Sequence, residues 1–122
     1  MSKVVAIDDE PFILMMIERK LKMGGIEVIA LRESKDALRT IREEKPDLII
    51  LDWMMPHVTG IDLCRTLKAD AELRDIPVFL LTGKGQDADL ELALQCGATM
   101  YITKPFSPKE LLENVRRTIR SG

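Results

Sequence analysis

The sequence has few of the residues that zinc sites and disulfide frameworks need. It contains two cysteines, Cys64 and Cys96, and one histidine, His57. Both cysteines lie within apolar patterns of helical period, where a lone cysteine usually serves as a small core side chain. The pattern argues against a structural zinc site and against a disulfide scaffold, and it fits a reducing cytosol.

Long apolar runs and an excess of positive charge are also missing. No apolar segment approaches the roughly 20 residues of a membrane span, and the first residues show no basic stretch leading into an apolar signal core. Lys and Arg number 18 against 20 Asp and Glu, a formal net charge of −2. We therefore expect a cytoplasmic chain that does not insert into a membrane and that offers, by itself, no basic surface for nucleic acid.

The overall composition is that of an ordinary globular domain. Hydrophobic residues make up 46% of the 122 positions and charged residues 31%, which excludes the disordered and collagen-like classes. A chain of this length can bury about two-thirds of its unfolded surface and fold without the support of disulfides or metal ions. No repeat, linker or low-complexity segment divides it, so we expect residues 1–122 to form one domain.

Five short apolar runs alternate with segments of helical period. The predicted strands are residues 4–7, 28–31, 48–51, 78–81 and 100–103, and five helices are expected, the fourth beginning at Asp87 or Asp89 and ending at Gly97. Parallel neighbours need a crossover, and crossovers are right-handed, so this alternation predicts a parallel sheet covered by helices on both faces. The expected fold class is α/β, a doubly wound five-stranded parallel sheet.

Several helix ends have clear local signals. Pro11 is placed as a first helical residue, and Gly24-Gly25 is expected to end that helix. Ser34 is the expected N-cap of the second helix, which Lys45-Pro46 should end. Residues 107–110 combine a serine N-cap, a first-turn proline and a capping-box glutamate, the clearest helix start in the chain.

Side chains suited to phosphoryl chemistry stand at the ends of four predicted strands. Asp8 and Asp9 follow the first, Asp52 the third, Thr82 the fourth and Lys104 the fifth. The carboxyl ends of parallel strands meet at one edge, where loops converge and ligands bind. Crowded carboxylates repel by roughly a few kcal/mol per close pair, and oxygen ligands of this kind suit Mg²⁺ beside a phosphate. A lysine and a hydroxyl suit phosphoryl oxygens, so the sequence predicts a phosphoryl site.

These residues resemble the response-regulator receiver domain of two-component signalling, of the single-domain, chemotaxis-regulator-like kind. The positions that carry the resemblance are Asp8-Asp9-Glu10, Asp52, Met55-Pro56, Gly60, Thr82-Gly83, Tyr101 and Lys104-Pro105-Phe106. They cover essentially the whole chain, in order, at successive strand ends. The resemblance implies a flavodoxin-like sheet with strand order 2-1-3-4-5.

The resemblance also implies a role for each acid. Asp52 would be the phosphoacceptor, attacking a phosphohistidine on a sensor histidine kinase or histidine phosphotransferase, or a small phosphodonor. Asp9 and Asp52 would hold Mg²⁺ directly, Asp8 would act through a water molecule, and the backbone carbonyl of Met54 would supply a further oxygen. The chain would catalyse only its own phosphorylation and dephosphorylation.

The remaining implied roles concern transfer and switching. Lys104 would neutralise charge during phosphoryl transfer, Thr82 would close on the phosphoryl group, and Tyr101 would then turn inward. The surface formed by the fourth helix, fifth strand and fifth helix would change and control a downstream protein or a covalently attached output domain. In the family the bond before Pro105 is typically cis.

The first predicted helix has a second apolar stripe, formed by Phe12, Met15, Met16 and Met23. One interpretation is that some of these side chains cover the edge of the core. The other is that Phe12 and Met16, next to the acids, dock the helical bundle of a histidine kinase or phosphotransferase.

Other functions fit the same residues less well. A receiver-like interaction module that no longer accepts phosphate fits less well, because the set of acids, threonine and lysine is complete. An Mg²⁺-dependent hydrolase would be favoured by a second acid two places after Asp52, where Met54 stands. Flavin binding is disfavoured by the acidic first loop, and the dinucleotide-like stretch 83–88 does not lie in the first βα unit. A stand-alone receiver and the N-terminal receiver of a longer protein both fit.

Overall fold

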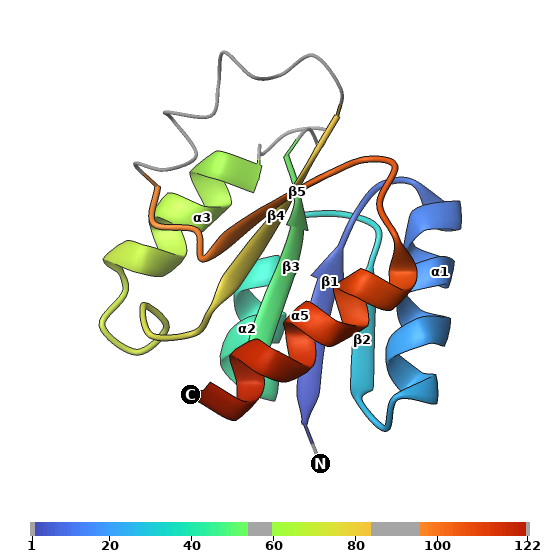
Figure 1. Cartoon of the computed structure of the whole chain (residues 1–122). Helices are drawn as coiled ribbons and strands as arrows, with labels where there is room; N and C mark the ends of the chain where they lie inside the picture. Colours follow the sequence, from blue (N-terminus) through green and yellow to red (C-terminus); the bar gives the residue numbers. More distant parts are fainter. Residues whose placement is uncertain (1, 54–59, 84–95, 122) are drawn as a thin grey trace.

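From the first strand to the fourth, strands and helices alternate along the chain as the hydrophobic pattern predicts (Figure 1). The structure is a computed structural model that describes residues 2–53, 60–83 and 96–121. Its elements are β1 (Lys3–Ile7), α1 (Pro11–Met23), β2 (Glu27–Leu31), α2 (Ala37–Glu44), β3 (Leu48–Asp52), α3 (Gly60–Ala69), β4 (Val78–Thr82), β5 (Met100–Thr103) and α5 (Pro108–Ser121). The helix expected between Asp87 or Asp89 and Gly97 falls largely outside the described residues.

The five strands form one parallel sheet in the order β2-β1-β3-β4-β5. This confirms the predicted α/β class and the strand order 2-1-3-4-5. The order reverses between β1 and β3, because β1 pairs with β2 on one side and with β3 on the other. In doubly wound sheets, ligands bind at the carboxyl ends of strands beside such a reversal.

The sheet separates two hydrophobic layers. On one face, α2 and α3 cover inward-pointing residues such as Ile49 and Leu51, and on the other, α1 and α5 cover Leu48 and Ile50. Successive strand residues point to opposite faces, so a strand buried on both sides has to be apolar throughout. All five residues of β3 are buried, including Asp52 at its end.

Most helix ends agree with their sequence signals, and one does not. The amide of Glu110 donates to Ser107 Oγ at 3.2 Å, which confirms the predicted cap of α5. In contrast, the N-cap of α2 is Asp36 and not Ser34. The Ser34 side chain is buried, and its backbone carbonyl accepts a bond from the amide of Ala37 at 3.1 Å. A single turn therefore precedes α2 and delays its start.

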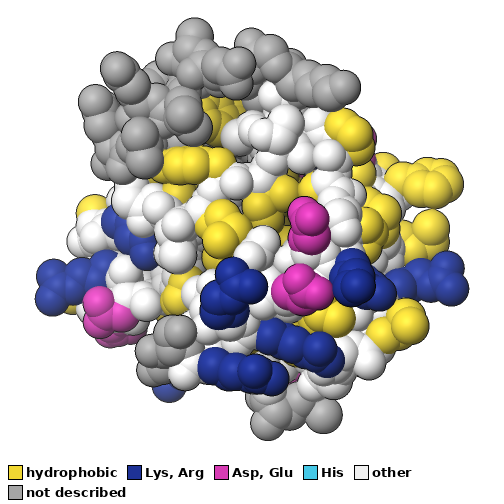
Figure 2. Space-filling model, in the orientation of Figure 1, with side chains coloured by type: hydrophobic (Ala, Val, Ile, Leu, Met, Phe, Trp, Pro, Cys, Tyr) yellow, Lys and Arg dark blue, Asp and Glu magenta, His cyan; other side chains and the backbone are white. Residues whose placement is uncertain are grey.

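The outer face of α5 is polar and charged. Glu113, Arg116, Arg117 and Arg120 line a shallow groove on it, and Figure 2 shows Lys and Arg side chains gathered over this helix. Arg116 donates to the Gly24 carbonyl at 3.1 Å, which ties α5 to the end of α1. Within the described ranges, no helix is long and apolar enough to cross a membrane.

Candidate functional site at the carboxyl edge of the sheet

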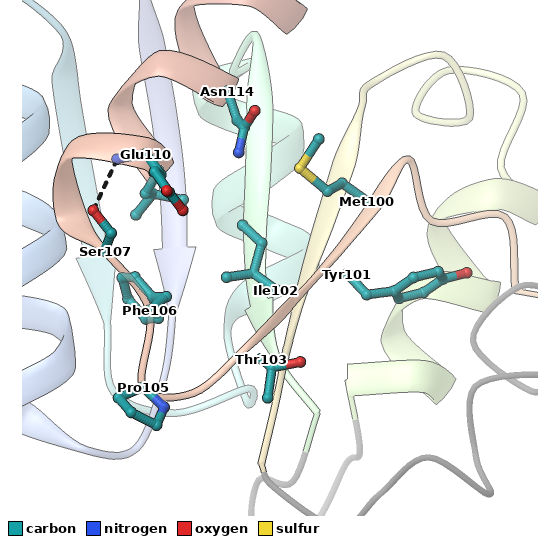
Figure 3. Close-up of a pocket in the computed structure, with 10 residues that line it drawn as sticks. Met100, Tyr101, Ile102, Thr103, Pro105, Phe106, Ser107, Glu110 and Asn114 are labelled. Atoms are coloured by element: carbon teal, nitrogen blue, oxygen red, sulfur yellow. Dashed lines mark hydrogen bonds between the residues drawn. The ribbon is translucent and has the colours of Figure 1, made fainter.

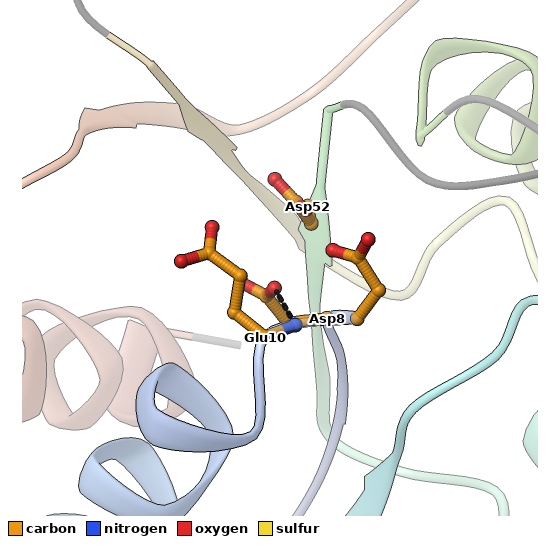
Figure 4. A group of neighbouring side chains, drawn as sticks. Asp8, Glu10 and Asp52 are labelled. Atoms are coloured by element: carbon orange, nitrogen blue, oxygen red, sulfur yellow. Dashed lines mark hydrogen bonds between the residues drawn. The ribbon is translucent and has the colours of Figure 1, made fainter.

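Strand register places Asp8 beside Asp52. Ile7 of β1 pairs with Leu51 of β3, so the next residue of each strand lies at the same level, on neighbouring strands about 4.8 Å apart. Both aspartates are buried. Figure 4 shows their side chains together with Glu10 at the ends of β1 and β3. The predicted meeting of the first and third strand ends is therefore present.

Four acids form a cluster whose donor atoms suit a hard cation. One carboxylate oxygen each from Asp8, Asp9, Glu10 and Asp52 lies within 4.8 Å of the other three. Asp8 Oδ1 accepts the Glu10 amide at 2.9 Å. Asp8 Oδ2 is buried without a hydrogen bond among the described residues, although the charge of Lys104 lies close to it. A set of donor atoms made up entirely of carboxylate oxygens fits Mg²⁺. Met54 lies outside the described residues.

Lys104 is the cation of the site. Its Nζ lies 2.9 Å from Asp8 Oδ2, 2.9 Å from Glu10 Oε1 and 3.1 Å from Asp52 Oδ1. The contacts with Glu10 and Asp52 are hydrogen bonds donated by Nζ, and the contact with Asp8 is an ion pair. The backbone amide of Lys104 donates to the Thr82 carbonyl at 2.6 Å, and the bond between Lys104 and Pro105 is cis.

Burial and like charge shift the pKa values at this site. Burial raises the pKa of Asp52 to about 7, the negative charge of Asp8 adds to the rise, and Lys104 opposes it. Burial lowers the pKa of Lys104, but the carboxylates of Asp8 and Glu10 outweigh it and hold that pKa above its ordinary value. Among the described residues, four acids face one lysine at the site, and a bound cation would offset this excess of negative charge.

Thr82 and Tyr101 come from the adjoining strands β4 and β5. Thr82 is buried at the end of β4, one residue beyond Leu81, which pairs with Asp52. The Tyr101 ring packs against the core layer of α2 and α3, and Figure 3 shows it pointing away from Met100 and Ile102. Its hydroxyl is buried and has no hydrogen-bond partner in the described part of the chain; burial raises its pKa.

A groove runs between β5 and α5 beside these residues (Figure 3). It has a volume of about 280 Å³, and its lining includes the apolar side chains Met100, Ile102, Phe106 and Leu111 with the polar Glu110 and Asn114. The predicted output surface includes this groove. The fourth helix of that surface lies outside the described residues.

Two contacts of the site do not follow from the sequence. The sequence indicates Glu10 only as part of the acidic motif, and its pairing with Lys104 joins positions 94 apart. For Gly60 the sequence predicts only that it opens α3 and belongs to the family motif. An added Cβ there would lie 2.2 Å from the carbonyl oxygen of Asp52, and the Gly60 amide donates to the Trp53 carbonyl at 2.8 Å. The signal for the second contact was the glycine itself, eight residues after the strand.

The sequence matches the profile of a protein family over residues 4–116, and that family is described as the response regulator receiver domain. The chain belongs to this family. The resemblance inferred from the strand-end residues is thus confirmed.

This receiver domain is similar in sequence and structure to known response regulators. It is 43% identical over 117 residues to the phosphate regulon transcriptional regulatory protein PhoB of Pseudomonas aeruginosa, a match that covers 96% of the chain and 51% of that protein. The chain thus spans about half the length of the curated relatives it matches. The BeF3-activated N-terminal receiver domain of Klebsiella pneumoniae RstA is 34% identical with a TM-score of 0.89, over 98% of this chain and 99% of that one.

A solved chemotaxis response regulator has the same fold. CheY4 of Vibrio cholerae is 30% identical with a TM-score of 0.89, covering 97% of this chain and 98% of that chain. Receiver domains of two-component response regulators are phosphoacceptor switches that bind Mg²⁺ through acidic residues and change their output surface on phosphorylation. They interact with histidine kinases and output targets.

Proposed function

We propose that Asp52 is the phosphoacceptor of this receiver domain. The observation that carries the proposal is the buried carboxylate of Asp52 at the end of β3, 3.1 Å from Lys104 Nζ and beside Asp8. A carboxylate oxygen of Asp52 attacks phosphorus and forms a new O–P bond. The bond from phosphorus to the donor's imidazole nitrogen or acetate oxygen breaks, and the leaving group departs with the electron pair.

Asp8, Asp9 and Asp52 would hold Mg²⁺, with Asp8 acting through water. The backbone carbonyl of Met54 remains a predicted fourth ligand. When bound, the ion neutralises the excess negative charge and supports the developing charge on phosphoryl oxygens.

The other site residues act directly on the transferred group. Lys104 binds a phosphoryl oxygen through its ammonium group, and Thr82 donates its hydroxyl to another oxygen. Hydrolysis reverses the modification, because water attacks phosphorus and releases inorganic phosphate from Asp52. The chain thus catalyses its own phosphorylation and dephosphorylation.

Phosphorylation changes the surface formed by β5 and α5. Movement of Thr82 toward the phosphoryl group makes room beside β4, and Tyr101 moves with it on the neighbouring strand. The groove between β5 and α5 then changes shape for a downstream protein or an attached output domain.

Residues 1–122 would form one receiver domain that works in the cytoplasm. By itself this domain would make no contact with nucleic acid.

The phosphodonor partner, a sensor histidine kinase or histidine phosphotransferase, docks on α1. Phe12 is 80% exposed, so it does not cover the core, and it lies next to the acids. Together with Met15, Met16 and Met23 it lines a largely apolar groove on the helix. Phe12 and Met16 are the proposed contacts.

The docking surface is tested by timing phosphotransfer from the cognate kinase to the Met16→Glu variant. Burying a carboxylate against an apolar partner should slow transfer, while phosphorylation by acetyl phosphate should stay at the wild-type rate. A folded variant that accepts phosphate from the kinase at the wild-type rate would refute the docking surface.

Trp53 offers the main test of the phosphoacceptor. It is buried directly after Asp52 and is the only tryptophan in the chain. Titration with Mg²⁺ should give a saturable fluorescence change, and beryllofluoride or acetyl phosphate should give a further one. Both the further change and the mass increase of one phosphoryl group should vanish in Asp52→Asn. If the folded protein shows no fluorescence change with Mg²⁺ or with beryllofluoride or acetyl phosphate, the result would instead indicate an interaction module that acts without phosphate.

A further inference from the structure

Glu10 is the exposed member of the carboxylate group around Lys104. Its side chain is 57% exposed, against 1% for Asp8 and 8% for Asp52, yet its Oε1 lies as close to Lys104 Nζ as Asp8 does, at 2.9 Å. Glu10 also stands at the N-cap of α1 without using its side chain as a cap. The side chain is therefore engaged with the lysine and not with its own helix.

A phosphoryl oxygen on Asp52 has to compete with the present partners of Lys104. The ammonium group donates hydrogen bonds to Glu10 and Asp52 and forms an ion pair with Asp8. Asp8 cannot leave cheaply, because its carboxylate is buried and a buried charge without partners is costly. Asp52 carries the phosphoryl group itself. Glu10 can rotate into water, where an exposed carboxylate is well solvated.

We propose that Glu10 is a positioning residue that holds Lys104 in the unphosphorylated state, so that its displacement limits phosphorylation by small anionic donors. The inference rests on the proposed role of Asp52. Breaking the contact of one exposed carboxylate should raise the rate of phosphorylation by about two- to five-fold. Dephosphorylation should not change, because Glu10 has already left Lys104 in the phosphorylated protein.

Charge alone predicts a different pattern. A fourth acid at the site also repels an anionic donor through its field. Glu10→Gln removes this field and weakens the contact, because a neutral amide oxygen holds an ammonium group less strongly than a carboxylate does. Glu10→Asp separates them, because it keeps the charge on a side chain one methylene shorter that no longer reaches Lys104. If the contact with Lys104 limits the rate of phosphorylation, Glu10→Asp should be as fast as Glu10→Gln. If the negative field limits the rate, Glu10→Asp should be as slow as the wild type.

The matched control is Glu33→Gln. Glu33 is an exposed acid that lines a groove with Asp9 on the β2 side of the site, so its removal changes the local charge by the same amount. Because the three acids on Lys104 are Asp8, Glu10 and Asp52, this variant leaves the lysine contacts in place. Thermal unfolding of each variant is measured in parallel, since an aspartate at an N-cap stabilises a helix by itself.

The experiment follows phosphorylation by acetyl phosphate at saturating Mg²⁺ through Trp53 fluorescence and intact mass, then dephosphorylation after the donor is removed. The expected result is faster phosphorylation in Glu10→Asp and Glu10→Gln, wild-type behaviour in Glu33→Gln, and one dephosphorylation rate for all four proteins. In ¹³C-lysine spectra, both Glu10 variants should shift the ε-carbon signal of Lys104.

Two results would overturn the inference in different ways. If the wild type is phosphorylated at Asp52 and Glu10→Asp reacts at the same rate, Glu10 has no such role and the proposed function still stands. If the wild type gains no phosphoryl group, or if Asp52→Asn gains one as readily as the wild type does, both the role of Glu10 and the proposed role of Asp52 would be wrong.

Discussion

Two lysines at opposite ends of the sheet are each surrounded by three acids. At the amino end of β1, Lys3 Nζ lies 3.0 Å from Glu44 Oε1 and 3.8 Å from Glu27 Oε2, and the Lys3 amide donates to Asp47 at 2.8 Å. At the carboxyl edge, Lys104 contacts the three acids of the site. Each lysine therefore has three acids in contact with it, and at the carboxyl edge Asp9 adds a fourth acid nearby.

The two groups differ in access to water. Glu44 and Glu27 expose 39% and 51% of their side chains, so water and salt screen their pairing with Lys3. The hydrogen bond to Glu44 raises the pKa of Lys3, against a smaller opposing effect of burial. At the carboxyl edge, burial raises the pKa of Asp52 to about 7. The difference between the two groups lies in Asp8 and Asp52, which expose only 1% and 8% of their side chains.

Lys104→Met should have the largest effect, because it removes the cation that contacts Asp52. Methionine keeps the length of the side chain without its charge. Loss of one charged donor to a transferring group typically costs about 10²- to 10³-fold in rate, and we expect phosphorylation by acetyl phosphate to fall by that amount. Intact-mass time courses at saturating Mg²⁺ measure it. A rate within about three-fold of the wild type would mean that burial does not distinguish the two lysines.

The pH dependence of stability should be the second largest effect. The folded pKa of Asp52 is about 7, against an ordinary 3.8. Between these values the folded state binds more protons than the unfolded state, so the free energy of unfolding falls as pH rises from about 4 to 7 and the loss is complete above that. The expected contribution without metal is on the order of 2 to 4 kcal/mol.

Asp52→Asn isolates this contribution. Denaturant unfolding in EDTA should show the variant to be more stable than the wild type at pH 8, with the difference shrinking toward pH 5. A difference that stays constant over this range would contradict the raised pKa.

Mg²⁺ should stabilise the carboxyl edge and leave the amino end unaffected. An ion present at ten times its dissociation constant adds about 1.4 kcal/mol to the free energy of unfolding. We expect this gain in the wild type and in Asp47→Asn at the amino end, and its loss in Asp9→Asn. Thermal melts with and without Mg²⁺ provide the measurement. An equal gain in all three proteins would show that the ion binds elsewhere.

Lys3→Met should have the smallest effect. Phosphorylation and the response to Mg²⁺ should match the wild type, because the lysine lies at the opposite end of the sheet from Asp52. Any loss of thermal stability should disappear in about 1 M salt, where exposed pairs are screened within about 3 Å. A change in phosphorylation rate would show that the two ends are coupled.

Much of the site follows from the sequence because parallel strands align their ends. The apolar runs before Asp8, Asp52 and Thr82, and the run before Lys104, indicated strands, and a parallel sheet brings their carboxyl ends to one edge. Alternation alone does not determine strand order. The order 2-1-3-4-5 came from the family resemblance, and the pairing of β1 with both β2 and β3 confirms it.

The remaining features depend on contacts that local pattern does not encode. Both Ser34 and Asp36 are suitable N-caps, and the choice between them is made by the burial of Ser34 in the folded chain. Glu10 meets Lys104 only after the first and last strands are assembled. The Lys3 group likewise joins β1 to the ends of α2 and β2, so its lysine could not be paired in advance.

The close contact at Gly60 has a consequence for the evolution of this chain. With only 2.2 Å between an added Cβ and the Asp52 carbonyl, even alanine would displace the backbone that carries the proposed phosphoacceptor. In a library of all single substitutions selected for signalling, position 60 should return glycine alone, while position 10 should accept many residues with altered timing. Natural variation can therefore tune the speed of the response through Glu10, while position 60 stays closed to change.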